Sequence, residues 1–159
     1  MKASRPRMPS AYGVPKDTKN VLPWSHASKR MSEALHYWVC SVDSTGRPHA
    51  TPVDGLWLDD ALYFGGSPET QRHRNIKGNR EICVHLESAA DVIILRGIAE
   101  ERTPDRALAE RLSEESKKKY GYSPGTDEYM KTGLWVLRAR TALGWKQFPK
   151  DVTRWAAES

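Results

Sequence analysis

A segment between residues 51 and 79 combines residue types that bind an anionic group. A β-type run ends in Phe64-Gly65-Gly66, and Ser67-Pro68-Glu69-Thr70 then has the composition of a helix start, with a capping serine and a proline in the first turn. Such a turn presents unpaired backbone N–H groups and partial positive charge, and the glycines let a ligand approach the backbone. Three cations follow on the same short helix: Arg72, Arg74 and Lys77. The segment predicts a phosphate cradle, although it is also typical of an ordinary helix with a solvated basic face.

Two further groups of side chains are candidates for a binding role. His49 lies in a proline-flanked run, two residues before Thr51. Near the C-terminus, aromatic and basic residues are interleaved: Trp145, Lys146, Phe148, Lys150, Arg154 and Trp155. Such a tail can stack on a planar ring and offset a phosphate. It can equally anchor an interface between subunits, and the sequence leaves both interpretations open.

Standard catalytic motifs are absent from the sequence. It contains no GxSxG, P-loop, GxGxxG or HExxH pattern, so no catalytic side chain is assigned and a cofactor would supply any chemistry. Cys40 and Cys83 lie far apart within apolar runs and lack metal-ligand spacing, so no metal site is expected. They are predicted to be buried, reduced thiols, which indicates a cytoplasmic protein.

Length and charge limit the possible classes of function. A chain of 159 residues fits one domain. No apolar run is long enough to span a membrane and no secretory signal is evident, so no membrane association is expected. The net charge of +5 is modest and spread along the chain. A nucleic-acid partner is therefore not expected.

Hairpin patterns and short turns predict a small antiparallel barrel capped by helices. Residues 1–23 are expected to form an N-terminal arm that is poorly ordered or straps across a partner, and residues 24–159 the domain. Strands are predicted at residues 36–42, 47–58, 61–66, 81–86, 91–101 and 134–143, and helices at 25–34, 67–77 and 103–120.

The ordered set of these segments resembles the pyridoxamine 5′-phosphate oxidase-like family, the FMN-binding split barrels. The resemblance covers about residues 24–155, and its most specific part is residues 46–53, GRPHATPV, followed by a hairpin and the helix that contains Arg72 and Asn75. It implies a mainly β fold, a six-stranded antiparallel split β-barrel with helices. It also implies a homodimer with two flavin sites at the interface.

The resemblance also implies which residues contact each part of the flavin. The ring would be lined by His49, Thr51, Pro52 and Val53. The ribityl chain would be approached by Phe64, Gly65 and Ser67. The phosphate would be held by Thr70, Arg72 and Arg74. Trp145 and Arg154 would reach the flavin from the partner subunit.

The sequence departs from the family pattern at Gln71, where relatives often carry a second cation. Substrate signatures of true pyridoxamine phosphate oxidases are not evident, and some relatives use the deazaflavin coenzyme F-420 or haem. Three functions therefore stay open: an FMN-dependent oxidoreductase transferring hydride to or from an unknown small molecule, an F-420-dependent reductase, and a non-catalytic flavin or haem module. Haem would need an axial ligand, for which the candidates are His49, His73 and His85.

Overall fold

Ten strands and four α-helices make up the part of the chain that the computed structural model describes, residues 1–158. The strands are β1 (Lys2–Ser4), β2 (His36–Val42), β3 (Pro48–Asp54), β4 (Leu56–Leu58), β5 (Ala61–Phe64), β6 (Glu81–His85), β7 (Val92–Arg102), β8 (Leu134–Arg138), β9 (Thr141–Trp145) and β10 (Thr153–Ala156). The helices are α1 (Trp24–Glu33), α2 (Gln71–Gly78), α3 (Arg106–Tyr120) and α4 (Thr126–Thr132), with a 3-10 turn at Ser10–Tyr12. None of these helices is both long and apolar enough to cross a bilayer.

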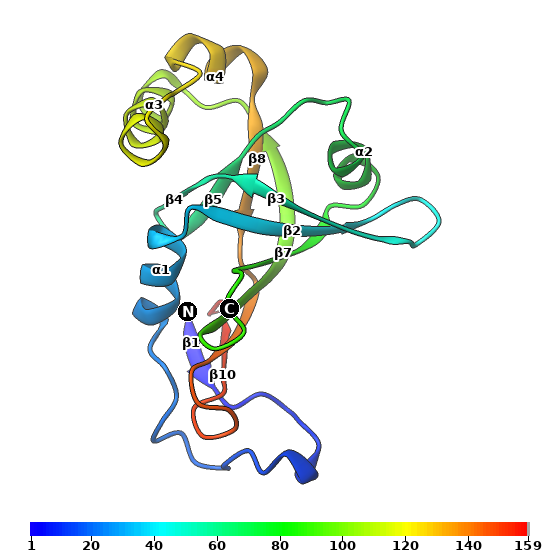
Figure 1. Ribbon diagram of the computed structural model, residues 1–159, viewed down its shortest axis with the longest axis vertical. Coiled ribbons are helices and arrows are strands. Elements are labelled where there is room, and N and C mark those ends of the chain that lie inside the picture. Colours follow the sequence, from blue (N-terminus) through cyan, green and yellow to red (C-terminus); the bar gives the residue numbers. More distant parts are fainter. Residues whose placement is uncertain (159) are drawn as a thin grey trace.

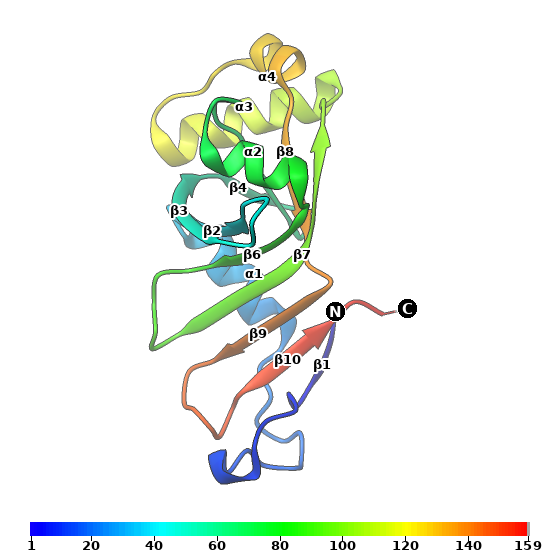
Figure 2. The same ribbon diagram turned by 90° about the vertical axis from the view of Figure 1, so that its right-hand side faces the viewer.

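The long strand β7 joins the two halves of the barrel (Figure 2). One half has the strand order β1-β10-β9-β7-β6-β2-β3, and in the other β7 pairs with β8, β8 with β5, and β5 with β4. The change of partner occurs near Gly97, where a Cβ would lie 2.7 Å from the Arg138 carbonyl oxygen. Every pairing is antiparallel, which confirms the mainly β, split-barrel expectation.

The strand count of six is wrong, because two predicted strands are each divided where the chain changes partner. The run predicted at 47–58 breaks at Gly55, since β3 pairs with β2 whereas β4 pairs with β5. The run predicted at 134–143 breaks at residues 139–140, since β8 pairs with β5 whereas β9 pairs with β10. Two short strands at the chain ends, β1 and β10, were also not predicted.

Residues near the N-terminus lie against the C-terminal strand of the same chain (Figure 1). β1 pairs with β10, with Lys2 opposite Ala156. The Arg5 guanidinium donates to the Val152 carbonyl oxygen at 3.0 Å, and the Leu22 amide donates to Thr153 Oγ1 at 2.8 Å. The arm expected at residues 1–23 is thus held partly to its own chain; a strap across a partner stays a prediction.

The main core lies inside the barrel beneath α1, which buries Ala27 and Met31. Trp155 is 0% exposed, packs 5.8 Å from the Trp24 ring and donates its indole N–H to the Leu22 carbonyl oxygen at 2.9 Å. Trp155 is therefore a core residue rather than part of a ligand-stacking tail. A second cluster lies between α3 and strands β4, β5 and β8.

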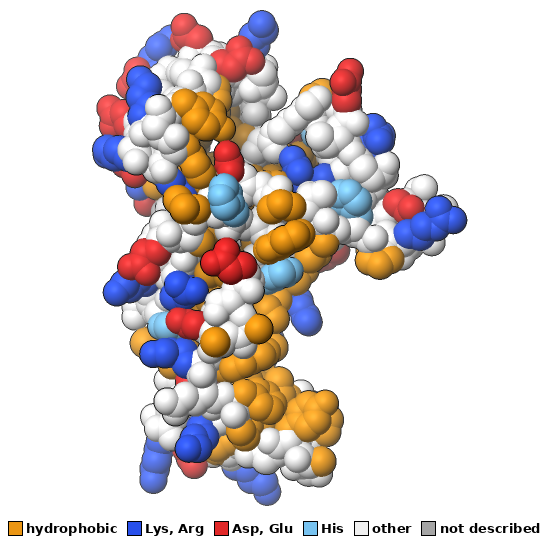
Figure 3. Space-filling model, viewed as in Figure 1, with side chains coloured by type: hydrophobic (Ala, Val, Ile, Leu, Met, Phe, Trp, Pro, Cys, Tyr) orange, Lys and Arg blue, Asp and Glu red, His pale blue; other side chains and the backbone are white. Residues whose placement is uncertain are grey.

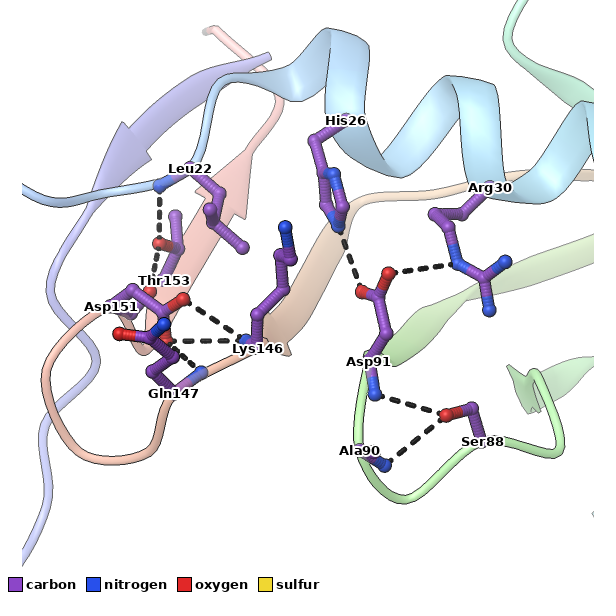
Figure 4. A network of polar contacts seen from close by, with 10 residues as sticks. All are labelled: Leu22, His26, Arg30, Ser88, Ala90, Asp91, Lys146, Gln147, Asp151 and Thr153. Atoms are coloured by element: carbon purple, nitrogen blue, oxygen red, sulfur yellow. Dashed lines mark hydrogen bonds and ion pairs between the residues drawn. The ribbon is translucent and has the colours of Figure 1, made fainter.

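A polar network at the base of α1 fixes this helix to the turn between β6 and β7 (Figure 4). The Asp91 carboxylate lies 2.8 Å from His26 Nε2 and 3.1 Å from Arg30 Nε. Asp151 nearby accepts from the backbone amide of Gln147 at 2.8 Å. The carboxylates of this network are occupied by contacts to helix and backbone groups, so the network has a structural role.

The outer face of the larger sheet carries a row of half-buried side chains. Along β2, β6, β7 and β9, buried and partly exposed residues alternate, so one set points inward and the other outward. The outward set includes Trp38, Cys40, Cys83, His85, Ile94, Leu143 and Trp145. In Figure 3 hydrophobic side chains run from the middle of the molecule to its lower end.

Candidate functional site

The helix α2 begins at Gln71, four residues later than the sequence predicted. Thr70 is the N-cap, and its hydroxyl accepts from the His73 amide at 3.2 Å. Ser67 instead closes a separate turn, because its carbonyl oxygen accepts from the Thr70 amide at 3.1 Å and its hydroxyl from the Glu69 amide at 3.2 Å. The Ser67–Thr70 segment is therefore a loop that delivers the chain to the helix.

Arg72 is a half-buried cation that points from α2 toward β3 and β5. Its guanidinium donates to Thr51 Oγ1 at 3.2 Å and to the Gly65 carbonyl oxygen at 3.0 Å. No carboxylate of the described residues forms an ion pair with it. Burial lowers the pKa of Arg72 below its ordinary value, but an arginine stays charged. Its positive charge is thus available to an anion.

The Arg72 guanidinium lines a cavity of about 320 Å³. One wall comes from β3, β5 and the loop that follows β5, and it includes Pro52, Val53, Phe64, Gly65 and Gly66. The other wall comes from α3, α4 and the loop between them, and it includes Leu112, Tyr120, Tyr122 and Tyr129. In Figure 1 these helices lie on the opposite side from α2. At Gly66, with φ 127°, a Cβ would collide with the Arg72 guanidinium.

The structure brings together about half of the residues that were candidates for cofactor binding. The cavity is lined by Pro52, Val53, Phe64, Gly65 and Arg72. Thr51 does not line it but accepts a hydrogen bond from Arg72. Ser67 lines a neighbouring cavity that it shares with Gly65 and Gly66. Thr70 caps α2 beside these cavities without lining either.

His49 lies two residues before Thr51 on the same side of β3. Its Nδ1 atom is buried and has no hydrogen-bond partner within the protein. A buried polar atom without a partner costs free energy, but His49 does not line the cavity beside Arg72.

Three other candidates lie away from the cavity. The Arg74 guanidinium donates to the Glu69 carbonyl oxygen and, at 3.0 Å, to Gln71 Oε1, and it borders a groove beside the β2–β3 hairpin. Trp145 and Arg154 lie on β9 and β10, and both are on the outer face of the sheet, because Arg154 is opposite the outward-pointing Leu143. No lining residue of the cavity comes from β9 or β10.

The helical wall of the cavity was not predicted from the sequence. It contains three phenols, Tyr120, Tyr122 and Tyr129, of which Tyr122 donates to Asp54 Oδ2 at 3.2 Å. The available signal was the grouping of these tyrosines around the glycine-bounded loop at residues 121–125. That loop turns α4 back onto α3, but the sequence does not show which face of the barrel the pair covers.

Behind this wall, the ammonium group of Lys119 is half-buried. It donates to the Tyr37 hydroxyl and to the Gly55 carbonyl oxygen, both at 2.8 Å, and it faces the rings of Tyr37 and Tyr120. Burial lowers the pKa of Lys119 from 10.5 to about 8, and the nearby Asp54 opposes this shift. Burial also raises the pKa of Tyr120 to about 12.

These shifts predict how stability depends on pH. Between pH 8 and 10 the folded chain has released the Lys119 proton and the unfolded chain has not, so Lys119 contributes a rise in the free energy of unfolding with pH. The thiols of Cys40 and Cys83, whose pKa values burial raises, contribute in the opposite direction. We expect a rise on the order of 1 kcal/mol from Lys119, because water still reaches part of the ammonium group. Above pH 10 the free energy should fall, because folded Tyr120 keeps a proton that the unfolded chain loses.

Urea unfolding of the wild type and of Lys119→Met at several pH values between 7 and 11 checks this prediction. The variant should lack the rise between pH 8 and 10 and keep the fall above it. A rise of equal size in both proteins would show that Lys119 is not its source.

Comparison with known proteins supplies the family. A model of the family described as pyridoxamine 5′-phosphate oxidase matches residues 27–146. No curated protein matches the sequence.

Solved structures share the fold at low sequence identity. A conserved hypothetical protein from Mycobacterium tuberculosis is 16% identical, with a TM-score of 0.65 over 81% of this chain and 88% of its own. A heme binding protein from Mycobacterium smegmatis is 20% identical, with a TM-score of 0.60 over 86% and 59% of the two chains. An F420 reductase is also 20% identical, with a TM-score of 0.57 over 76% and 96%. At these identities the likeness concerns the fold, whereas the family model covers most of the sequence: the chain belongs to the pyridoxamine 5′-phosphate oxidase family.

Proposed function

We propose that this protein binds FMN beside Arg72 and acts as a flavin-dependent oxidoreductase on a small molecule. The observation that carries the proposal is the half-buried Arg72 guanidinium, which has neutral oxygen partners and forms no ion pair with a carboxylate of the described residues. A buried cation without a counter-charge favours an anionic ligand. A phosphate with its oxygen acceptors matches the planar donors of arginine.

The residues around Arg72 fit the rest of such a ligand. Thr51 offers a hydroxyl, and Gly65 and Gly66 leave the backbone accessible. Pro52, Val53 and Phe64 offer an apolar surface. A bound flavin supplies hydride transfer at its ring. The chain's own residues would hold the phosphate, orient the ring along β3 and exclude water with the tyrosine wall.

Two alternatives follow from the same site. The first is a deazaflavin coenzyme F-420 reductase, which is supported by a structural neighbour described as an F420 reductase. The second is a non-catalytic flavin or haem module, supported by a neighbour described as a heme binding protein.

We also propose that the protein is a cytoplasmic homodimer. The half-buried row on the outer sheet face, together with Phe148 at 44% exposure, supports a second copy as its cover. Trp145 and Arg154 lie on this face and would reach the partner's flavin. We expect the mass of a dimer in size-exclusion chromatography with light scattering; a monomer at micromolar concentration would contradict it.

The absorbance spectrum of freshly purified protein, followed by titration with FMN, F-420 and haemin, tests the function. A flavin spectrum, or tight and selective binding of FMN, is the expected result. Selective binding of F-420 or of haemin would move the protein to the corresponding alternative. Failure to bind any of the three would contradict the proposed function.

A further inference from the structure

The only two cysteines of the chain are direct neighbours across two strands. Cys40 on β2 is opposite Cys83 on β6. Both are partly exposed on the outer face rather than buried as the sequence suggested. Each belongs to the residues of its strand whose side chains point outward. No chemical role has been given to this pair in the proposed flavin site.

The hydrogen-bond pattern defines the type of this pair. The Leu86 amide donates to the Ile93 carbonyl oxygen, so the backbone groups of even-numbered residues in β6 point toward β7. Those of Cys83 therefore point toward β2, and Cys40 and Cys83 form a hydrogen-bonded antiparallel pair. Cα atoms in such a pair are about 5.5 Å apart, within the range of about 4.4–6.8 Å found across disulfides. The Cβ separation of such pairs exceeds the usual disulfide value, so a bond here would be strained and easily reduced.

Arg96 on β7 distinguishes the two thiols. It is opposite Cys83 in the register of β6 with β7, so its side chain lies on the same face of the sheet as the thiol. Burial raises the pKa of both thiols, and at Cys83 the charge of Arg96 opposes the effect of burial. The charge of Arg96 favours the thiolate form of Cys83, so we assign the first reaction to Cys83, and Cys40 lies opposite it to attack after oxidation.

We propose that Cys40 and Cys83 are a redox site that a peroxide converts into a reversible intramolecular disulfide. The Cys83 thiolate attacks one peroxide oxygen, the O–O bond breaks, and the departing hydroxide takes up a proton to leave as water. Cys83 is then a sulfenic acid. The Cys40 sulfur attacks the Cys83 sulfur, the S–S bond forms, the S–O bond breaks, and a second water leaves with the Cys40 proton. Two thiols are oxidised and one peroxide is reduced to two waters.

The position of this bond has a consequence for the site described above. The loop closed by Cys40 and Cys83 contains β3, β4, β5 and α2, and so contains Thr51, Gly65 and Arg72. A disulfide would restrict the conformations of this half of the cavity. The thiols lie on the face that a second copy would cover, so we expect their oxidation below the concentration at which the dimer dissociates.

Hydrogen peroxide added to the purified protein tests the proposal, followed by mass spectrometry without reductant. The expected product is a monomeric chain that has lost two hydrogen atoms, with a peptide containing Cys40 joined to one containing Cys83, and dithiothreitol should reverse it. Cys40→Ser and Cys83→Ser should each block the product. Arg96→Gln should slow it several-fold, whereas Arg140→Gln, an exposed arginine paired with Glu81, should not.

Any of three outcomes would overturn the proposal: stepwise addition of oxygen without the disulfide, disulfides between chains only, or two thiols that stay free both above and below the concentration at which a dimer dissociates. None of these measurements requires a bound cofactor, so the result is independent of whether FMN is the ligand.

Discussion

Replacing Arg72 with alanine should weaken FMN binding by about 10- to 100-fold, since hydrogen bonds to a charged group contribute about 1.5–3 kcal/mol. The change removes the guanidinium that contacts Thr51 and Gly65 at the cavity. Quenching of flavin fluorescence during titration measures the affinity. Arg72→Lys keeps the charge without the planar donors, so its affinity for FMN should lie between those of the wild type and Arg72→Ala.

Arg74→Ala is the matched control for this change. Arg74 lies two residues away on the same helix, but it contacts Glu69 and Gln71 and is not part of the cavity wall. Its removal should leave the FMN affinity within a few-fold of the wild type. Equal losses in the two variants would indicate a general electrostatic effect, and unchanged affinity in Arg72→Ala would exclude the proposed phosphate contact.

Trp155→Ala should destabilise the protein by about 3–5 kcal/mol, the usual cost of truncating a large buried aromatic side chain. Trp155 is 0% exposed, and the change would also leave the Leu22 carbonyl oxygen without its indole donor. The midpoint of urea unfolding, monitored by circular dichroism, measures the effect.

Trp145→Ala provides the comparison, because Trp145 is only half-buried and its neighbours lie on the outer face. It should cost little stability in a monomer and should instead shift the monomer–dimer equilibrium toward monomer. A loss of stability as large as that of Trp155→Ala would contradict the division between core and interface residues.

Local sequence patterns were sufficient for most elements of the barrel. Alternating apolar residues predicted β2, β6 and β7 closely, and Gly121 marked the end of α3, where its φ is 77°. The errors arose where contacts with distant parts of the chain determine the ends of helices and strands. Ser67-Pro68 has good helix-start chemistry, yet the turn closed by Ser67 moves the cap to Thr70. A change of sheet partner at Gly55 has no strong local signal, because the flanking runs are both typical of strands.

The candidate site was predictable to the extent that it depends on sequence order. Thr51, Gly65 and Arg72 meet because a strand, a hairpin and a helix follow one another over a short stretch. Arg72 and Arg74 were equivalent as residue types, and only the direction in which each side chain leaves α2 separates them. The tyrosine wall depends on how α3 and α4 pack on the barrel, a long-range contact that no local pattern describes.

The pairing of β1 with β10 has a consequence for the order in which the protein is made. Lys2 and Ala156 are opposite one another, so β1 has no sheet partner on the ribosome until β10 has also been translated. Contacts of such large sequence separation form late and slow the folding of a domain. β1 therefore stays unpaired while β2 to β9 are made, and its docking along β10 completes the sheet only after the other strands are available.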